Sequence, residues 1–398
     1  MQETIKLYEE DSLLRSCEAE VLSCLQTDKG YEVILDRTVI FPEGGGQPSD
    51  RGTAGGAAVT GALERSGRVV HYCEQPLAVG TKVKVELDWE RRLDHMQQHC
   101  GEHLLSHAFW QTAKAANVGF RMNEEAVFID LDKEVSPAEL LAAEGLANSQ
   151  IWDNRAVSVS LLLPEELAKL DLRKKNEQLK GLCRVVSVEG GDGCTCCGTH
   201  PPFTGMVGSV RITGAEKHRG GSRIKFVCGK RALLDAQKKH EAIAAANMLL
   251  SVKPEEVPDA IRRLKEEMAN VKAMLKRRTE ELFMAEKPKL LEQALISDNG
   301  TRLLLLAREE CEPSEAKLLA EIVTEGEALA LGVFYRSGDR LNYLFAANPG
   351  AADCRVLCTK TSQALGGRGG GNQLFSQGSA SFQGSAQAAI DTLEKILL

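Results

Sequence analysis

The sequence has no uninterrupted apolar run of about 18 residues, the length that a helix needs to cross a membrane. Its start, MQETIKLYEEDSLLRSC, is acidic and lacks the apolar core of a secretory signal peptide. We therefore expect a cytoplasmic protein without a membrane partner. In that compartment its 12 cysteines should be reduced, most of them buried and some available to bind a metal.

The chain also lacks a positive net charge. Its formal charge of −7 at pH 7 argues against broad, non-specific affinity for nucleic acid. Residues 211–231 nevertheless contain seven basic residues, Arg219 and Arg223 among them, against one glutamate, a local balance of +6. Such a stretch is often only a solvated strand edge, and the alternative is a surface that contacts phosphates.

A chain of 398 residues should form two to three domains. Residues 1–90 contain short alternating strands, and residues 91–229 begin with a histidine-bearing helix followed by strands. Residues 230–294 are helical with an interruption at SVKPEEVP, and residues 295–398 alternate between strand and helix. We predict an α+β multidomain fold, with a small β-rich N-terminal domain, an α+β domain, a helical linker and an α/β C-terminal domain.

The helical linker has a short apolar seam with the spacing of a coiled coil. The seam consists of Ile261, Leu264, Met268, Val271 and Leu275. Its next position is Arg278, so the pattern favours a helical hairpin or a modest homodimer contact over a long coiled coil.

Two histidine-bearing pairs predict a metal site. His99 and His103 lie in HMQQHCGEHLLSHAF, and Cys196 and His200 lie in CTCCGTH. Residues four apart on a helix or tight turn point the same way, and imidazole and thiolate are preferred zinc ligands. Two such pairs from distant segments can close a tetrahedral site.

Spacing alone leaves several ligand sets open. Four histidines form one ridge on the helix: His95, His99, His103 and His107. Two of them are expected to be ordinary surface or core residues. Three cysteines crowd the second motif: Cys194, Cys196 and Cys197.

HMQQHCGEHLLS followed by CCGTHPPFTGMVGSV resembles the editing domain of alanyl-tRNA synthetase and its free-standing relatives, the AlaX-type trans-editing proteins. IFPEGGGQPSDRG at 40–52 resembles the glycine-rich motif of that family, and EKHRGGSRIKFVCGKR at 216–231 resembles the strand that closes its catalytic domain. The motifs have the family's order and spacing, and the resemblance covers essentially the whole chain, as in the long AlaX class.

The resemblance implies that residues 91–229 are the zinc-binding editing domain. It assigns the Zn²⁺ ligands as His99, His103, Cys196 and His200. Cys100, Glu102 and Arg121 depart from the family's usual residues, and Cys100 adds a competing thiol. The roles of Cys100, Cys194 and Cys197 stay open.

The resemblance further implies an ATP-independent hydrolase that removes serine, and as a second substrate glycine, from mischarged tRNA(Ala). Thr38 would contact the seryl hydroxyl, although the residue alone suits an ordinary strand threonine. Gln47 would help to place the substrate. Glu102 is a candidate general base, although it lies about 100° around the helix from His103 and need not face the metal.

The segment GGRGGGNQLFSQGSA at 366–380 suits a flexible loop, but it also resembles the terminal motif of the alanyl-tRNA synthetase C-terminal domain, shared with DHH-family phosphodiesterases. The aspartate-rich catalytic half of those phosphodiesterases is absent from the sequence. The resemblance implies tRNA contacts by Gly366, Gly367, Arg368, Gly369 and Gly370, and it favours the same role for Arg219 and Arg223.

Two other functions stay open. The chain could deacylate a different mischarged aminoacyl-tRNA, or it could be a non-catalytic tRNA-binding protein stabilised by zinc. Four protein ligands would fill a tetrahedral zinc, whereas a catalytic zinc usually keeps one open position. The sequence therefore leaves a catalytic and a positioning role for the metal open.

Overall fold

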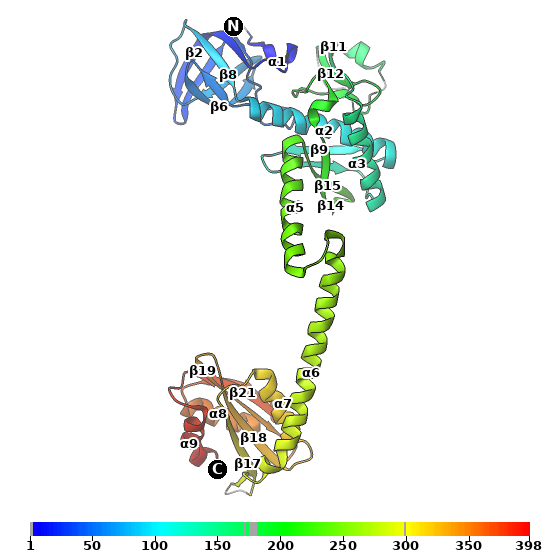
Figure 1. The fold of residues 1–398 in the computed structure, drawn as a ribbon. Helices are drawn as coiled ribbons and strands as arrows, with labels where there is room; N and C mark the ends of the chain where they lie inside the picture. Colours follow the sequence, from blue (N-terminus) through cyan, green and yellow to red (C-terminus); the bar gives the residue numbers. More distant parts are fainter. Residues whose placement is uncertain (1–2, 171, 175–180, 298–299) are drawn as a thin grey trace. The chain divides into compact units, whose positions relative to one another are not determined.

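The computed structural model describes residues 3–170, 172–174, 181–297 and 300–398. They form two compact units, Met1–Ala245 and Ala246–Leu398, and each unit contains helices and sheets (Figure 1). The predicted α+β multidomain fold is confirmed. In the described parts of the chain, the structure has no helix with the length and apolar character needed to span a bilayer.

The first unit begins with a closed β-barrel, drawn in blue in Figure 1. Its strands, in barrel order, are β2 (Ser16–Thr27), β3 (Gly30–Leu35), β7 (Arg68–Cys73), β6 (Ala57–Arg65), β5 (Gly52–Ala54) and β8 (Lys82–Leu87). Alternate side chains of a strand point to opposite faces, so one set fills the barrel, including the fully buried Val21, Val33 and Val85. A short strand pair, β1 (Ile5–Lys6) with β4 (Arg37–Thr38), and helix α1 (Leu7–Glu10) complete this part.

The barrel leads into α2 (Trp89–Ala113), which carries the paired histidines. The Asp88 side chain caps this helix by accepting a hydrogen bond from the Arg91 backbone N–H at 3.2 Å. A four-stranded antiparallel sheet packs on α2, in the order β14 (Val210–His218), β15 (Gly221–Cys228), β10 (Val127–Leu131) and β9 (Asn117–Met122), and α3 (Pro137–Trp152) packs beside the helix. Gln98 bonds both backbone groups of Cys228, at 2.9 and 2.8 Å, which fixes α2 against the end of β15.

A smaller antiparallel sheet positions the second metal motif. It consists of β11 (Val157–Leu162), β12 (Cys183–Val188) and β13 (Gly193–Thr195), with the short α4 (Pro164–Leu167) after β11. The loop that holds Cys196 and His200 follows β13 directly and ends at the 3₁₀ turn η1 (Thr204–Val207).

The predicted helical region forms α5 (Gly229–Leu250) and α6 (Val257–Leu291), with a 3₁₀ turn, η2 (Pro254–Glu256), between them. The break falls at SVKPEEVP, as the sequence predicted. Side chains of the predicted seam on α6 are 42–64% exposed: Ile261, Leu264, Met268, Val271 and Leu275.

The second unit is built on a six-stranded sheet. Its order is β16 (Leu295–Ile296), β17 (Arg302–Arg308), β18 (Leu329–Ser337), β19 (Arg340–Ala347), β21 (Phe375–Ala380) and β20 (Arg368–Gly371). Helix α7 (Pro313–Thr324) connects the parallel pair β17 and β18, and α8 (Cys354–Ala364) and α9 (Ala386–Leu397) follow later. Alternate residues of β18 pack on opposite faces: Leu331 contributes to the core with α7, and Phe334 to the core with α8 and α9. This is the α/β arrangement that the sequence predicted.

Candidate metal centre

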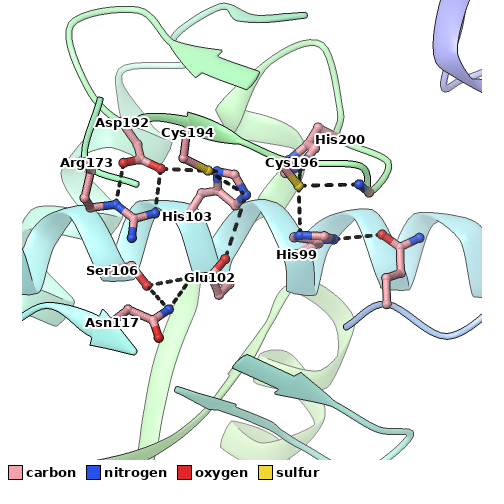
Figure 2. A network of polar contacts seen from close by, with 12 residues as sticks. His99, Glu102, His103, Ser106, Asn117, Arg173, Asp192, Cys194, Cys196 and His200 are labelled. Carbon is pink, nitrogen blue, oxygen red and sulfur yellow. Dashed lines mark hydrogen bonds and ion pairs between the residues drawn. The ribbon is translucent and has the colours of Figure 1, made fainter. Parts of the chain in front are cut away.

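The two histidines of α2 lie one helical turn apart and face the same side (Figure 2). Their ring centroids are 5.4 Å apart. Both residues are only 2% exposed, so the helix presents two imidazoles inside the protein rather than at its surface.

The loop after β13 brings a thiol and a third imidazole to these rings. The Cys196 sulfur lies 3.3 Å from Nε2 of His99 and 3.3 Å from Nε2 of His200. One donor atom from each of four residues lies within 4.8 Å of all the others: His99, His103, Cys196 and His200. The four residues chosen from the sequence therefore converge on one point.

Close packing shapes this loop. A Cβ on Gly198 would lie 2.1 Å from Cε1 of His99, so only glycine lets the chain pass over that ring. The Arg184 side chain donates hydrogen bonds to the carbonyl oxygens of Cys196 and Gly198, at 2.9 and 2.8 Å. Arg184 thus holds the turn that presents the thiol.

Gln47 is fully buried and lies directly behind His99. Its Oε1 is 2.8 Å from Nδ1 of His99 and accepts the backbone N–H of Thr199 at 3.1 Å, while its Nε2 donates to the Thr199 hydroxyl. A carbonyl oxygen can only accept, so Nδ1 of His99 carries the proton and Nε2 is left unprotonated toward Cys196. Gln47, predicted to help place the substrate, therefore orients the ring of His99.

The donor set fits a zinc ion. Three imidazoles and one thiolate, drawn from two segments, are ligands that zinc prefers. Burial lowers the pKa of His200 to about 3, so this ring is neutral at pH 7, as a metal ligand must be. Burial alone raises the pKa of the Cys196 thiol, and a cation bound among the three imidazoles would instead favour the thiolate that zinc takes as a ligand.

Glu102 is buried and lies closer to the site than its position on the helix indicated. Its Oε1 accepts hydrogen bonds from the Ser106 hydroxyl at 2.6 Å and the Asn117 amide at 2.7 Å. Its Oε2 is 3.8 Å from Nε2 of His103 (Figure 2). The carboxylate is therefore held with one oxygen toward the metal ligands.

Thr38 is fully buried at the end of the short strand β4. Its hydroxyl lies 2.8 Å from Nε2 of His71 and accepts the backbone N–H of Ile40 at 3.0 Å. Nδ1 of His71 lies 3.2 Å from the Val33 carbonyl oxygen and must donate to it, so the Thr38 hydroxyl donates to Nε2. One lone pair of the Thr38 oxygen is left for a further donor.

The other candidate ligands have separate places. Cys100, on α2, packs in the hydrophobic core, and burial raises the pKa of its thiol to about 12. Cys197 is exposed. Cys194 is buried, with its sulfur 3.5 Å from Nδ1 of His103. His95 and His107 do not belong to the four-residue cluster.

The expected basic patch at 211–231 is largely neutralised by neighbouring elements. Five of its seven basic side chains pair with acidic side chains outside the segment: Arg211 with Glu144, Lys217 with Glu134, Arg223 with Asp130, Lys230 with Glu90 and Arg231 with Asp94. Subtracting these five charges from the local balance of +6 leaves +1. Arg219, exposed at the turn between β14 and β15, is better placed to contact a phosphate than Arg223.

In the second unit, residues 368–371 of the glycine-rich segment form an edge strand rather than a flexible loop. A Cβ on Gly367 would lie 2.6 Å from the Ser379 carbonyl oxygen, and one on Gly369 would lie 2.6 Å from the Cys358 sulfur. These two glycines are needed for packing. A Cβ on Gly370 would meet no described atom within 4 Å, and Arg368 is exposed beside it.

Two buried ion pairs were not found from the sequence. Asp192 and Arg173 lie beside His103, and Arg92 and Asp50 join α2 to the segment that carries Gln47. The members of each pair are 19 and 42 residues apart, and no local spacing connects them.

Comparison with known proteins identifies the relatives of this chain. Residues 183–225, which include Cys196 and His200, match the family described as the threonyl and alanyl tRNA synthetase second additional domain. The chain is 31% identical over 392 residues to the alanyl-tRNA editing protein Aarsd1 of Mus musculus, a match that covers 94% of this chain and 93% of that relative. It is 29% identical over 387 residues to the alanyl-tRNA editing protein AlaX-L of Pyrococcus horikoshii, covering 94% of each chain.

Two further similarities are partial. The alanine–tRNA ligase of Pyrococcus abyssi is 29% identical over 425 residues, which cover all of this chain and 44% of the ligase. The crystal structure of the C-Ala domain from Aquifex aeolicus alanyl-tRNA synthetase matches 26% of this chain at 22% identity, with a TM-score of 0.23 that is too low to support an argument. The similarity to Aarsd1 of Mus musculus extends over almost the whole length of both chains at 31% identity. This chain therefore belongs to the family of alanyl-tRNA editing proteins.

Proposed function

We propose that this protein is a trans-editing hydrolase that removes serine from mischarged Ser-tRNA(Ala), with Gly-tRNA(Ala) as a second substrate. The observation that carries the proposal is the convergence of four donor atoms from α2 and the loop after β13. Family membership supports the choice of mischarged tRNA(Ala) as the substrate.

A cavity of about 470 Å³ lies next to His200 in the first unit. It is lined by His200, by residues 8–13 and by the apolar side chains Val159 and Leu161 of β11. Three of the residues in 8–13 are acidic, namely Glu9, Glu10 and Asp11, against one basic lining residue, Arg184, so the acidic side of the cavity favours a cation. We assign the aminoacyl end of the tRNA to this cavity, with its α-ammonium group toward the acidic side chains.

The reaction is hydrolysis of an ester that joins the amino acid to the terminal ribose. Zinc bound by the four donor atoms would supply Lewis-acid polarisation of the ester carbonyl or activation of a water molecule. Gln47 fixes the ring of His99. Glu102 is the proposed general base, because Ser106 and Asn117 occupy one carboxylate oxygen and leave the other toward His103.

One observation favours a second candidate function. Four protein ligands fill the coordination sphere of a structural zinc, which suits a non-catalytic tRNA-binding protein. The two functions differ in turnover: the proposed hydrolase releases amino acid from tRNA, and the binding protein does not.

The test is a deacylation assay with full-length protein and a panel of tRNA(Ala) carrying serine, glycine or alanine, together with other mischarged tRNAs. We expect turnover of Ser-tRNA(Ala), slower turnover of Gly-tRNA(Ala) and sparing of Ala-tRNA(Ala). Preferred hydrolysis of another mischarged tRNA would assign a different substrate. Tight tRNA binding without hydrolysis would leave only the binding function.

Thr38→Val should weaken the discrimination of Ser-tRNA(Ala) from Ala-tRNA(Ala). The substitution keeps the side-chain shape and removes the lone pair left for a seryl hydroxyl, so the loss should be about 1–3 kcal/mol in relative kcat/KM. It also removes the bonds to His71 and Ile40, so circular dichroism must show that the variant is folded. Thr60→Val, at an exposed threonine of the barrel, is the matched control and should leave the ratio unchanged. Equal ratios in parent and Thr38→Val would show that Thr38 only supports the fold.

Arg368→Ala should weaken tRNA binding without lowering kcat. The exposed guanidinium on the edge strand β20 is the proposed phosphate contact, so its loss should reduce the slope of log K against log salt by about 0.9. The measurement is tRNA affinity at several salt concentrations, with the exposed Arg340→Ala in the same unit as control. An unchanged affinity and slope would remove Arg368 from the tRNA-binding surface.

We also propose that the exposed seam of α6 forms a homodimer contact. Five apolar side chains at coiled-coil spacing are at least 42% exposed, and Arg278 ends the seam. Its length suits a modest contact rather than an extended coiled coil.

A further inference from the structure

A carboxylate and a guanidinium lie behind His103, on the side opposite Glu102 (Figure 2). Asp192 Oδ2 is 3.2 Å from Nδ1 of His103, and the Arg173 side chain donates to both Asp192 oxygens, at 2.6 and 2.9 Å. Asp192 is 2% exposed, and the side chain of Arg173 is 8% exposed. A charged pair that is buried this deeply is stable only if further hydrogen bonds satisfy its polar atoms, and His103 provides one of these bonds.

We propose that Asp192, held by Arg173, is the positioning residue of the metal ligand His103. The carboxylate accepts the proton of Nδ1, which leaves Nε2 unprotonated for the metal and fixes the rotation of the ring. The inference rests on the metal centre proposed above and extends it to two residues that do not touch the ion.

The alternative is that Asp192 is itself a ligand. His103, Asp192 and Cys194 form a second group whose donor atoms lie within 4.8 Å of one another. However, both Asp192 oxygens already accept hydrogen bonds from Arg173, whose positive charge would repel a cation at that point. The Cys194 sulfur is 3.5 Å from Nδ1 and 3.7 Å from Nε2 of His103, so it does not select one ring nitrogen. The charged pair therefore orients the ligand rather than forming a second metal site.

The three imidazoles of the centre differ in the hydrogen-bond partner of the ring nitrogen that does not face the metal. His99 is backed by the neutral amide of Gln47, and His103 is backed by the anion Asp192. Nδ1 of His200 is buried and has no hydrogen-bond partner among the described residues. An anionic acceptor makes an imidazole a more basic ligand, so His103 should contribute more to metal retention than its neighbours do.

The test is the zinc affinity of the full-length Asp192→Asn variant, measured by competition with a chromophoric chelator. Asparagine keeps the shape but removes the negative charge, and affinity should fall about 10–100-fold. The visible spectrum of the cobalt-loaded variant should also change, because the orientation of His103 enters the ligand field. Cys194→Ser removes the nearby thiol and should leave both the affinity and the spectrum as in the parent.

A second variant separates positioning from folding. Asp192→Asn alone leaves the buried Arg173 without a counter-charge, whereas the double variant with Arg173→Met removes both charges. We expect the double variant to regain the circular dichroism and thermal stability of the parent while its zinc affinity stays low.

Parent-like zinc affinity in either variant would overturn the assignment, and so would a loss in Cys194→Ser alone. These outcomes do not depend on tRNA. A parent protein that binds zinc but fails to deacylate any tRNA would refute the proposed function and leave the positioning result intact.

Discussion

Cys196→Ala is expected to abolish stoichiometric zinc binding and to lower kcat/KM for Ser-tRNA(Ala) by about three orders of magnitude. The thiol is the anionic member of the four-residue donor set, and its sulfur lies 3.3 Å from both His99 and His200. A Lewis acid at the ester contributes several kcal/mol to the transition state, and each 1.36 kcal/mol is about tenfold in rate. Elemental analysis and single-turnover deacylation would measure the two effects.

Cys197→Ala is the matched control. This neighbouring cysteine is exposed and lies outside the metal cluster, so its removal should change neither zinc content nor rate. Circular dichroism of both variants is needed to exclude unfolding. A Cys196→Ala protein that keeps one zinc per chain, or that deacylates at the parental rate, would exclude the thiol as a ligand of a functional metal.

Arg92→Met is expected to destabilise the first unit by about 3–5 kcal/mol, because it leaves Asp50 as an unpaired buried charge. Both side chains are completely buried. Arg92 Nε donates to Asp50 Oδ2 at 3.0 Å, and the same side chain donates to the Ser12 and Val39 carbonyl oxygens. Since Val39 and Asp50 flank the segment that carries Gln47, the pair also fixes this segment to α2.

The measurement is urea denaturation followed by tryptophan fluorescence. All three tryptophans of the chain, Trp89, Trp110 and Trp152, lie in the first unit, so the signal reports on that unit alone. Lys230→Met breaks the exposed pair with Glu90 and should cost at most about 1 kcal/mol. Equal losses in the two variants would show that the buried pair does not hold the unit together.

The two histidine-bearing pairs could be recognised because their spacing is local, whereas the choice of four candidate ligands came from the family resemblance. His99 and His103 lie one turn apart on a helix, and four residues also separate Cys196 from His200. The break between α5 and α6 was predictable for the same reason, from the proline-containing segment between two helical stretches.

What could not be predicted depends on contacts between distant segments. The Gln47 side chain reaches His99 across 52 positions, and Asp192 reaches His103 across 89, so neither partner follows from spacing. The basic segment carries an excess of positive charge in the sequence, but its acidic partners lie on other elements, such as Asp130 on β10. The composition of the glycine-rich segment suits a flexible loop, but in the structure residues 368–371 form a strand that pairs with β21.

Burial changed the interpretation of two side chains. The Thr38 hydroxyl, expected at a substrate, already bonds His71 and the Ile40 backbone. Glu102, which from its position on the helix need not face the metal, is held near His103 because Ser106 and Asn117 bind one of its oxygens. Both arrangements depend on side-chain packing that periodicity does not specify.

The most direct test of the central claim is to strip the full-length protein of metal and titrate zinc back while Ser-tRNA(Ala) deacylation is followed. The proposed centre predicts that the stripped protein, still folded by circular dichroism, is inactive, and that activity returns and saturates at about one zinc per chain. Full deacylation by the folded, metal-free protein would contradict the claim that these four residues form a metal centre needed for editing.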